Sequence, residues 1–190
     1  MPAVLTLEEA RRVLRAADDN RCPWMGFRNR AMISVLLFCG LRRQELADLK
    51  LSDLDLQSRW VKVQRGKGGK GRSIPLAPEA AGAIADWLEF RPVVDHEYLL
   101  TGLGGRRLEK NGLVRVFREV AKRAGVDRRG VSLHTLRHTF ASLLLQEGCD
   151  LVSIQELLGH SDLSTTAIYL HLDAAHLQGA VERHPLSRLE

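Results

Sequence analysis

The sequence predicts a mainly α-helical domain with one small antiparallel β-sheet, the α+β class. Three observations lead to this prediction. Apolar residues recur every three or four positions, the helical spacing, along most of the 190 residues. A single stretch, residues 53–75, alternates apolar and polar residues as strands do, around a glycine-rich turn. Neither an internal repeat nor a proline- or serine-rich linker divides the chain, so we expect one domain.

The first two helices are predicted by their end signals and their apolar residues. Thr6 and Glu9 form a capping box, which starts a helix that reaches about residue 17. Polar residues then break the chain before a second helix, roughly 27–39. This helix is apolar on almost every side, which is typical of a helix buried in the core. Gly40 ends it.

A short helix at 43–50 leads into the predicted sheet. Residues 54–56 and 60–64 alternate, and apolar residues lie on both sides of Pro75. Between them, the glycine-rich segment 66–71 also carries lysines. We therefore expect an antiparallel sheet whose hairpin has a flexible, basic tip.

Helices resume at residue 78. A short strand is possible at 98–100, followed by a loop and then by a second amphipathic helix whose apolar stripe covers 113–124. The rest, 133–183, is predicted to form three or four helices. Its breaks fall at Gly148, Gly159 and near Asp173.

Composition narrows the class of protein. The chain has 28 basic and 23 acidic residues, a net charge of +5, which leans toward a polyanionic partner. Its longest apolar run, 31–41, is too short to cross a bilayer, and no export signal opens the chain. The three scattered cysteines, Cys22, Cys39 and Cys149, are typical of reduced thiols. We expect a cytoplasmic protein without a membrane partner.

Two apparent motifs are rejected. Residues 66–71 match the dinucleotide fingerprint GxGxxG, but a predicted strand follows them where that fingerprint needs a helix. His134 and His138 have the spacing of a zinc helix, yet Thr135 stands where a metalloprotease has its glutamate, and Arg137 would repel a dication. The sequence therefore predicts neither a nucleotide site nor a metal site.

Four short motifs carry residues suited to phosphate chemistry. Guanidinium groups pair with phosphate oxygens, and cleavage of a phosphodiester also needs a nucleophile and a proton donor. The motifs are GLRRQEL at 40–46, KGGKGR at 67–72, LHTLRHTFA at 133–141 and LGHSDLSTTAIY at 158–169. This set, in this order, resembles the catalytic domain of the tyrosine recombinases, the phage integrase family, over about residues 6–184. The resemblance implies a fold shared with the type IB topoisomerases.

The resemblance implies catalytic roles for six residues. They are Arg42, Lys67, His134, Arg137, His160 and Tyr169. The tyrosine would be the nucleophile, the arginines would clamp the phosphate, the lysine would protonate the leaving 5′ oxygen, and the histidines would handle protons and donate to the phosphate. Glu45 would orient the first arginine, and His138 would support the site as a packing histidine. The implied reaction is transesterification through a 3′-phosphotyrosyl intermediate, without metal or cofactor.

Double-stranded DNA is the partner that the resemblance and the charge distribution favour. Between residues 59 and 137 there are seventeen basic and eight acidic side chains. The candidate DNA-binding residues lie beside the motifs, in the hairpin and on one helix face: Arg43, Arg65, Lys70, Arg72, Arg115, Arg118, Lys122 and Arg123. Lys70 also competes with Lys67 for the role of proton donor.

Assembly and domain content follow from the same resemblance. Recombination joins two duplexes with four active sites, which implies a homotetramer on DNA. Segment 173–184 would form a short amphipathic helix that docks on a neighbouring subunit, with packing on its own chain as the alternative. Family members usually carry a helical core-binding domain before the catalytic one. We expect residues 1–190 to be a single catalytic domain without that N-terminal domain, and to bind DNA weakly and with strong salt dependence.

Two alternatives to a recombinase stay open at this point. A type IB topoisomerase-like enzyme would share the chemistry, and a catalytically idle DNA-binding module would share the fold. Within the recombinases, the motifs leave open a mobile-element integrase, a Xer-type resolvase and an integron-type enzyme, as well as the DNA site. Bound to DNA, the cytoplasmic protein would associate with the nucleoid.

Overall fold

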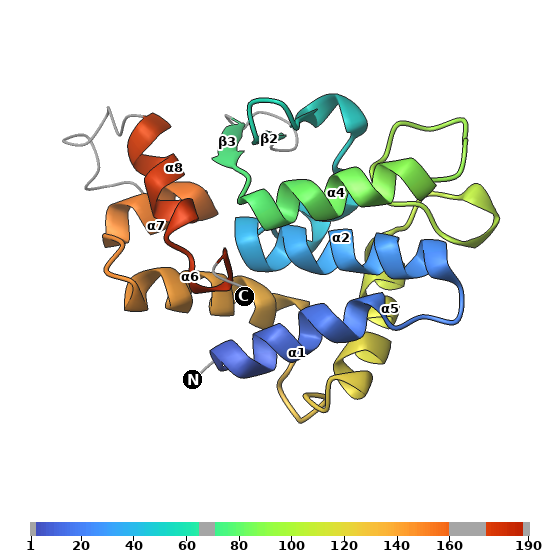
Figure 1. Cartoon of the computed structure of the whole chain (residues 1–190), viewed down its shortest axis with the longest axis horizontal. Helices are drawn as coiled ribbons and strands as arrows, with labels where there is room; N and C mark the ends of the chain where they lie inside the picture. The colour runs from blue at the N-terminus through green and yellow to red at the C-terminus, as the bar shows by residue number, and fades with distance from the viewer. Residues whose placement is uncertain (1–2, 65–70, 160–173, 188–190) are drawn as a thin grey trace.

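The buried helix expected near residues 27–39 is the centre of the fold. In the computed structural model, which describes residues 3–64, 71–159 and 174–187, this helix is α2 (Pro23–Cys39). It begins earlier than predicted because Pro23 occupies its first turn, where the missing N–H has no helical partner to lose. Residues 31–41 are all buried, and the helices α1, α4 and α6 pack around α2 (Figure 1).

The other elements follow the predicted order. They are α1 (Leu7–Asp18), α3 (Arg43–Asp48), η1 (Leu51–Asp53), α4 (Pro78–Phe90), η2 (Leu103–Gly105), α5 (Lys110–Arg123), α6 (Leu133–Gln146), α7 (Leu151–Leu158), α8 (Ala174–Glu182) and η4 (Pro185–Ser187). The capping box that predicted α1 is present, because the Thr6 side chain accepts from the Glu9 backbone and the Glu9 carboxylate accepts from the Thr6 backbone. The mainly α-helical class with one small sheet is confirmed.

The sheet has three antiparallel strands in the order β1 (Leu54–Asp55), β2 (Trp60–Val63) and β3 (Arg72–Pro75). In the β2–β3 ladder Val61 pairs with Ile74, and Val63 pairs with Arg72. The valines and Ile74 are buried, so this face of the sheet covers the core. As a result, the N-terminal end of β3 lies next to the helices that carry the motifs.

The expected strand at 98–100 is wrong. Only single bridges form there, between Lys50 and Tyr98 and between Thr101 and Arg107. The Leu99 carbonyl accepts from two side chains, the Trp87 indole at 2.9 Å and the Arg91 guanidinium at 3.3 Å. Because side chains occupy this carbonyl, no regular ladder forms around it.

The C-terminal segment packs on its own chain. Helix α8 contacts α7 and β3, and η4 contacts α1 (Figure 1). Leu177, Val181 and Leu186 are buried in these contacts, and the His184 ring lies 5.5 Å from the rings of both Phe38 and Phe140. None of the helices in the described ranges is long and apolar enough to cross a membrane.

Candidate active site

Arg42 lies at the start of α3, immediately after the turn that ends α2. That turn needs a glycine: Gly40 has φ +61°, and a Cβ there would lie 2.4 Å from the Phe140 side chain. The Arg42 backbone N–H donates to Glu45 at 2.7 Å, and its guanidinium donates to the same carboxylate at 3.0 Å. A second guanidinium nitrogen donates to the Gly159 carbonyl at 3.1 Å. The expected contact between Arg42 and Glu45 is therefore present.

Arg137, on α6, approaches the same place from the core. Arg137 is only 8% exposed. Its guanidinium donates to the Gly40 carbonyl and to the Leu158 carbonyl, the latter at 2.7 Å. Burial and then the nearby positive charge of Arg42 lower the pKa of Arg137 to about 10, so it remains a cation at neutral pH. The packing thus confines a guanidinium beside that of Arg42.

Arg72 differs from its sequence-based interpretation as a DNA-binding residue. Its side chain is only 11% exposed and turns inward from the start of β3. Its guanidinium donates twice to the Glu45 carboxylate, at 2.8 and 2.9 Å, and its Nε donates to the Leu157 carbonyl at 2.8 Å. The physical reason is strand alternation: Arg72 shares a face of β3 with the buried Ile74. That spacing is the sequence signal that would have placed Arg72 inside.

Glu45 is the shared partner of two of these arginines. Burial of its carboxylate opposes ionisation, but hydrogen bonds from the Arg72 side chain and the Arg42 backbone, with the charges of both arginines, outweigh burial and lower its pKa to about 2. The carboxylate is therefore ionised throughout the physiological range. With one carboxylate among three guanidinium groups, this cluster carries an excess of positive charge that suits an anion.

The last turn of α7 is where the three arginines converge. The carbonyls of Leu157, Leu158 and Gly159 accept from Arg72, Arg137 and Arg42 respectively. The carbonyls of a final helical turn have no partner within the helix, and the C-terminal end of the helix dipole favours cations. Residue 160 of the fourth motif follows directly, so the arginine cluster marks the place where that segment begins.

Helix α6 carries two histidines, for which the sequence predicted different roles: proton handling for His134 and packing for His138. His134 is exposed in the first turn, one helical turn before Arg137, where a bound molecule can reach it. His138 is also exposed, so its interpretation as a packing histidine is wrong. The helical spacing places residue 138 on a different face of α6 from the buried stripe formed by Leu136 and Phe140.

Several candidate residues fall outside the described part of the chain. They are Arg65, Lys67 and Lys70 of the hairpin, and His160 and Tyr169 of the fourth motif. Their roles stay predictions. The neighbours of these segments, β3 and the end of α7, lie against each other.

The basic face of α5 is exposed as expected. Arg115, Arg118 and Lys122 lie on this face, whereas Arg123 donates to the Ala16 carbonyl of α1 at 3.3 Å and so turns toward that helix. Arg43, beside Arg42, is half-buried. Three exposed cations on one helix are consistent with a surface for a polyanion.

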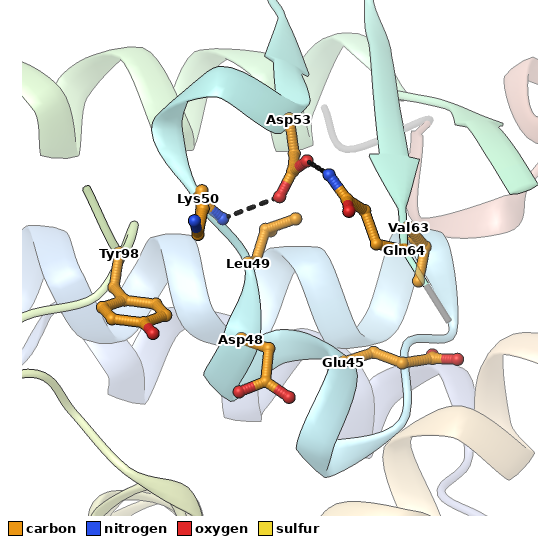
Figure 2. Close-up of a pocket in the computed structure, with 8 residues that line it drawn as sticks. All are labelled: Glu45, Asp48, Leu49, Lys50, Asp53, Val63, Gln64 and Tyr98. Atoms are coloured by element: carbon orange, nitrogen blue, oxygen red, sulfur yellow. Dashed lines mark hydrogen bonds between the residues drawn. The ribbon is translucent and has the colours of Figure 1, made fainter. Parts of the chain in front are cut away.

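A hollow of about 260 Å³ is lined in part by Glu45, the carboxylate that the arginines share; Figure 2 shows the residues around it. Its lining includes the acidic residues Glu45, Asp48 and Asp53. Asp53 accepts from the Lys50 backbone at 3.0 Å and from the Gln64 amide at 2.8 Å. Its acidic lining does not suit a phosphate. Within residues 3–64, 71–159 and 174–187, no three histidine, cysteine or carboxylate side chains are grouped as metal ligands.

Known proteins are similar to this chain in sequence and in fold. The sequence profile of the Phage integrase family matches residues 3–176. The chain belongs to the phage integrase family. It is 36% identical to the tyrosine recombinase XerD of Listeria innocua serovar 6a over 192 residues, which is 97% of this chain and 63% of that protein. It is 40% identical to the tyrosine recombinase XerA of Thermococcus kodakarensis over 189 residues, 98% of this chain and 64% of that protein.

Solved structures in the same family have the same fold. A crystal structure of XerA recombinase superimposes with a TM-score of 0.79 at 36% identity, covering 97% of this chain and 64% of that one. XerH site-specific recombinase bound to its difH substrate, in a pre-cleavage complex, gives a TM-score of 0.74 at 32% identity, covering 90% of this chain and 51% of that one. This phage integrase family chain therefore spans less than two thirds of the length of these relatives.

Proposed function

We propose that this chain is the catalytic part of a site-specific DNA recombinase, which cleaves and rejoins DNA strands by metal-independent transesterification. The observation that carries the proposal is the convergence of Arg42 and Arg137, from distant motifs, at the end of α7. Two guanidinium groups held side by side can neutralise the non-bridging oxygens of a phosphodiester. The relatives named as tyrosine recombinases, and the XerH structure with its DNA substrate, support the same reaction.

In the proposed reaction, Tyr169 attacks the scissile phosphorus. A bond forms between the tyrosine oxygen and phosphorus, and the bond to the 5′ oxygen breaks, which leaves a 3′-phosphotyrosyl link. The tyrosine proton passes to a histidine of the site, His134 or His160, and Lys67 donates a proton to the leaving oxygen. A 5′ hydroxyl from a partner strand reverses the step. The energy of the phosphodiester bond is kept in the covalent intermediate, so the proposed reaction needs no cofactor.

Double-stranded DNA is the proposed partner, and a homotetramer on two duplexes is the proposed assembly. The basic face of α5 and the hairpin would lie along the phosphate backbone. In the tetramer, the C-terminal segment would leave its own chain and make equivalent contacts on a neighbour. The buried apolar residues Leu177, Val181 and Leu186 support a docking role, because they already cover a surface of the domain. We expect the protein to act in the cytoplasm, on the nucleoid.

Trapping of a covalent adduct tests the proposed function. A nicked suicide DNA loses its 5′-hydroxyl fragment after cleavage, so the phosphotyrosyl adduct accumulates and migrates slowly on a denaturing gel. We expect an adduct with the wild-type chain and none with Tyr169→Phe. Tyr98→Phe is the matched control: Tyr98 is the other tyrosine of the chain and its ring packs under Arg107, a contact that phenylalanine keeps.

Absence of a wild-type adduct on any duplex, or an adduct with Tyr169→Phe, would contradict the proposal. Relaxation of supercoiled DNA without site preference would favour a type IB topoisomerase.

A further inference from the structure

Arg72 occupies a special place between the hairpin and the end of α7. It is the first residue of β3, directly after the hairpin segment that carries Lys67 in sequence, and it contacts the turn that precedes His160. Its Nε and both terminal nitrogens donate to protein acceptors: the Leu157 carbonyl and the two oxygens of Glu45. A bidentate pair of this kind fixes the plane of both groups.

Arg42 is held less completely. Its side chain is 40% exposed against 11% for Arg72, and only one of its side-chain nitrogens reaches Glu45. If Arg42 were the only cation beside Glu45, the carboxylate would bind its guanidinium through both oxygens. Because Arg72 satisfies both oxygens, Glu45 holds the Arg42 guanidinium through one hydrogen bond, in addition to the one that it accepts from the Arg42 backbone N–H. The guanidinium nitrogen that donates to the Gly159 carbonyl can then turn to a ligand.

We propose that Arg72 is a positioning residue for DNA cleavage: it holds the Glu45 carboxylate and the last turn of α7, so that Arg42 and Arg137 remain available to the scissile phosphate. This inference rests on the function proposed above. A phosphate would draw Arg42 and Arg137 away from the carbonyls of Gly159 and Leu158, since charge-assisted hydrogen bonds are the stronger ones. Arg72 then remains on Leu157, and it keeps the helix end in place.

The role differs from a direct DNA contact in a measurable way. Each phosphate contact that is lost reduces the slope of log Kd against log salt by about 0.9. Arg72 turns inward and contacts protein acceptors, so Arg72→Gln leaves this slope and the affinity for DNA unchanged. The rate of covalent adduct formation falls on the order of 100-fold, the effect typical of a small misplacement of reacting groups.

The pH dependence of cleavage separates positioning from general structural support. Arg72 provides the strongest of the interactions that lower the pKa of Glu45, so its removal raises this pKa. Arg42 still bonds to the carboxylate, the charge of Arg137 is near enough to interact with it, and Lys50, Asp48 and Asp53 line the hollow beside it. The ratio of the Arg72→Gln rate to the wild-type rate therefore falls as the pH is lowered. In the Glu45→Gln background, the same ratio is independent of pH.

The experiment compares wild type, Arg72→Gln, Glu45→Gln, the double variant and Arg91→Gln in single-turnover cleavage of suicide DNA. Arg91 is the matched control, because its guanidinium also makes three hydrogen bonds to protein acceptors, in this case the backbone carbonyls of His96, Tyr98 and Leu99. We expect Arg91→Gln to keep the wild-type rate when both variants are folded, as judged by thermal unfolding and DNA affinity.

Three results would overturn the inference. The first is a wild-type cleavage rate in Arg72→Gln, and the second is a slope of log Kd against log salt that falls in this variant by the value of about one phosphate contact. The third is a ratio of the Arg72→Gln rate to the wild-type rate that does not vary with pH. Failure of the proposed function looks different. In that case the wild-type chain itself forms no Tyr169-dependent adduct, whatever residue stands at position 72.

Discussion

Single residues in this protein carry charge where water is largely excluded. Arg137 and Glu45 keep their ionised forms because each has partners at hydrogen-bond distance, the carbonyls of Gly40 and Leu158 for the arginine and two guanidinium groups for the carboxylate. Removal of one partner would leave the other charge buried and uncompensated. At the residue scale, then, the site is a set of mutually dependent ions.

His184 is the opposite case, a titratable residue that the fold keeps neutral. It is fully buried between Phe38 and Phe140, and its Nδ1 accepts from the Leu186 backbone N–H at 3.4 Å. Burial, opposed by a weaker backbone hydrogen bond at Phe140, lowers its pKa from 6.5 to about 4. Because the unfolded chain binds the proton more tightly, this residue contributes no penalty above pH 6.5 and an increasing one below it.

We expect the free energy of unfolding to fall on the order of 3 kcal/mol between pH 6.5 and pH 4 through His184 alone. The measurement is urea unfolding across this range for wild type and His184→Phe, which keeps an aromatic ring between the two phenylalanines and cannot titrate. The wild type should lose more stability than the variant as the pH falls. Parallel curves would contradict the buried, neutral state of His184.

Helix α5 shows how one element divides its tasks. Its apolar stripe, including Phe117 and Val120, is buried against the core, while Arg115, Arg118 and Lys122 are exposed. The basic residues of its last turn also complement the C-terminal end of the helix dipole. The helix was predictable from its spacing, but only the packed structure shows that Arg123 turns toward α1.

Replacement of Arg115 and Arg118 by glutamine should weaken DNA binding at every sequence tested and lower the salt slope by roughly two contacts. The reason is that both guanidinium groups are exposed on one face and would release counterions from phosphates. The measurement is a gel-shift or anisotropy titration at several salt concentrations.

Arg128→Gln controls for the loss of an arginine charge elsewhere on the surface. Arg128 is already paired with the Glu9 carboxylate, at 2.5 and 3.2 Å, so its replacement should leave the salt slope unchanged. A slope unchanged in the double variant, or lowered equally by Arg128→Gln, would exclude α5 as the DNA-binding face.

At the scale of the whole molecule, the C-terminal segment closes the structure. Helix α8 and η4 return across α7, β3 and α1, and the Arg59 side chain bonds to Glu182 at 3.2 Å. The segment was expected to dock on a neighbour or on its own chain, and in the isolated chain it does the latter. If subunits exchanged this segment, it would make the same apolar contacts on a neighbour. The exchange would therefore lose little buried surface and would link neighbouring subunits.

Deletion of residues 173–190 should therefore abolish cooperative assembly on a DNA with two adjacent half-sites. Binding to a single half-site, which needs only the folded domain, should persist. Both are measured by gel shift over a range of protein concentrations. Cooperative assembly that is unchanged after the deletion would refute docking on a neighbour, whereas loss of single-site binding as well would show that the segment is needed for the domain's own fold.

Much of this protein follows from its sequence alone. The capping box of α1, the apolar run of α2, the glycine-bounded hairpin and the four motifs are local patterns, and local patterns suffice to predict elements and to name the chemistry. Tertiary structure decided the rest: that Arg72 turns inward to Glu45, that His138 is exposed, that residues 98–100 form no strand, and that the C-terminal segment packs on its own chain. The physical reason is that these outcomes depend on partners distant in sequence, because a buried charge or an occupied carbonyl is stable only where the fold supplies its counterpart.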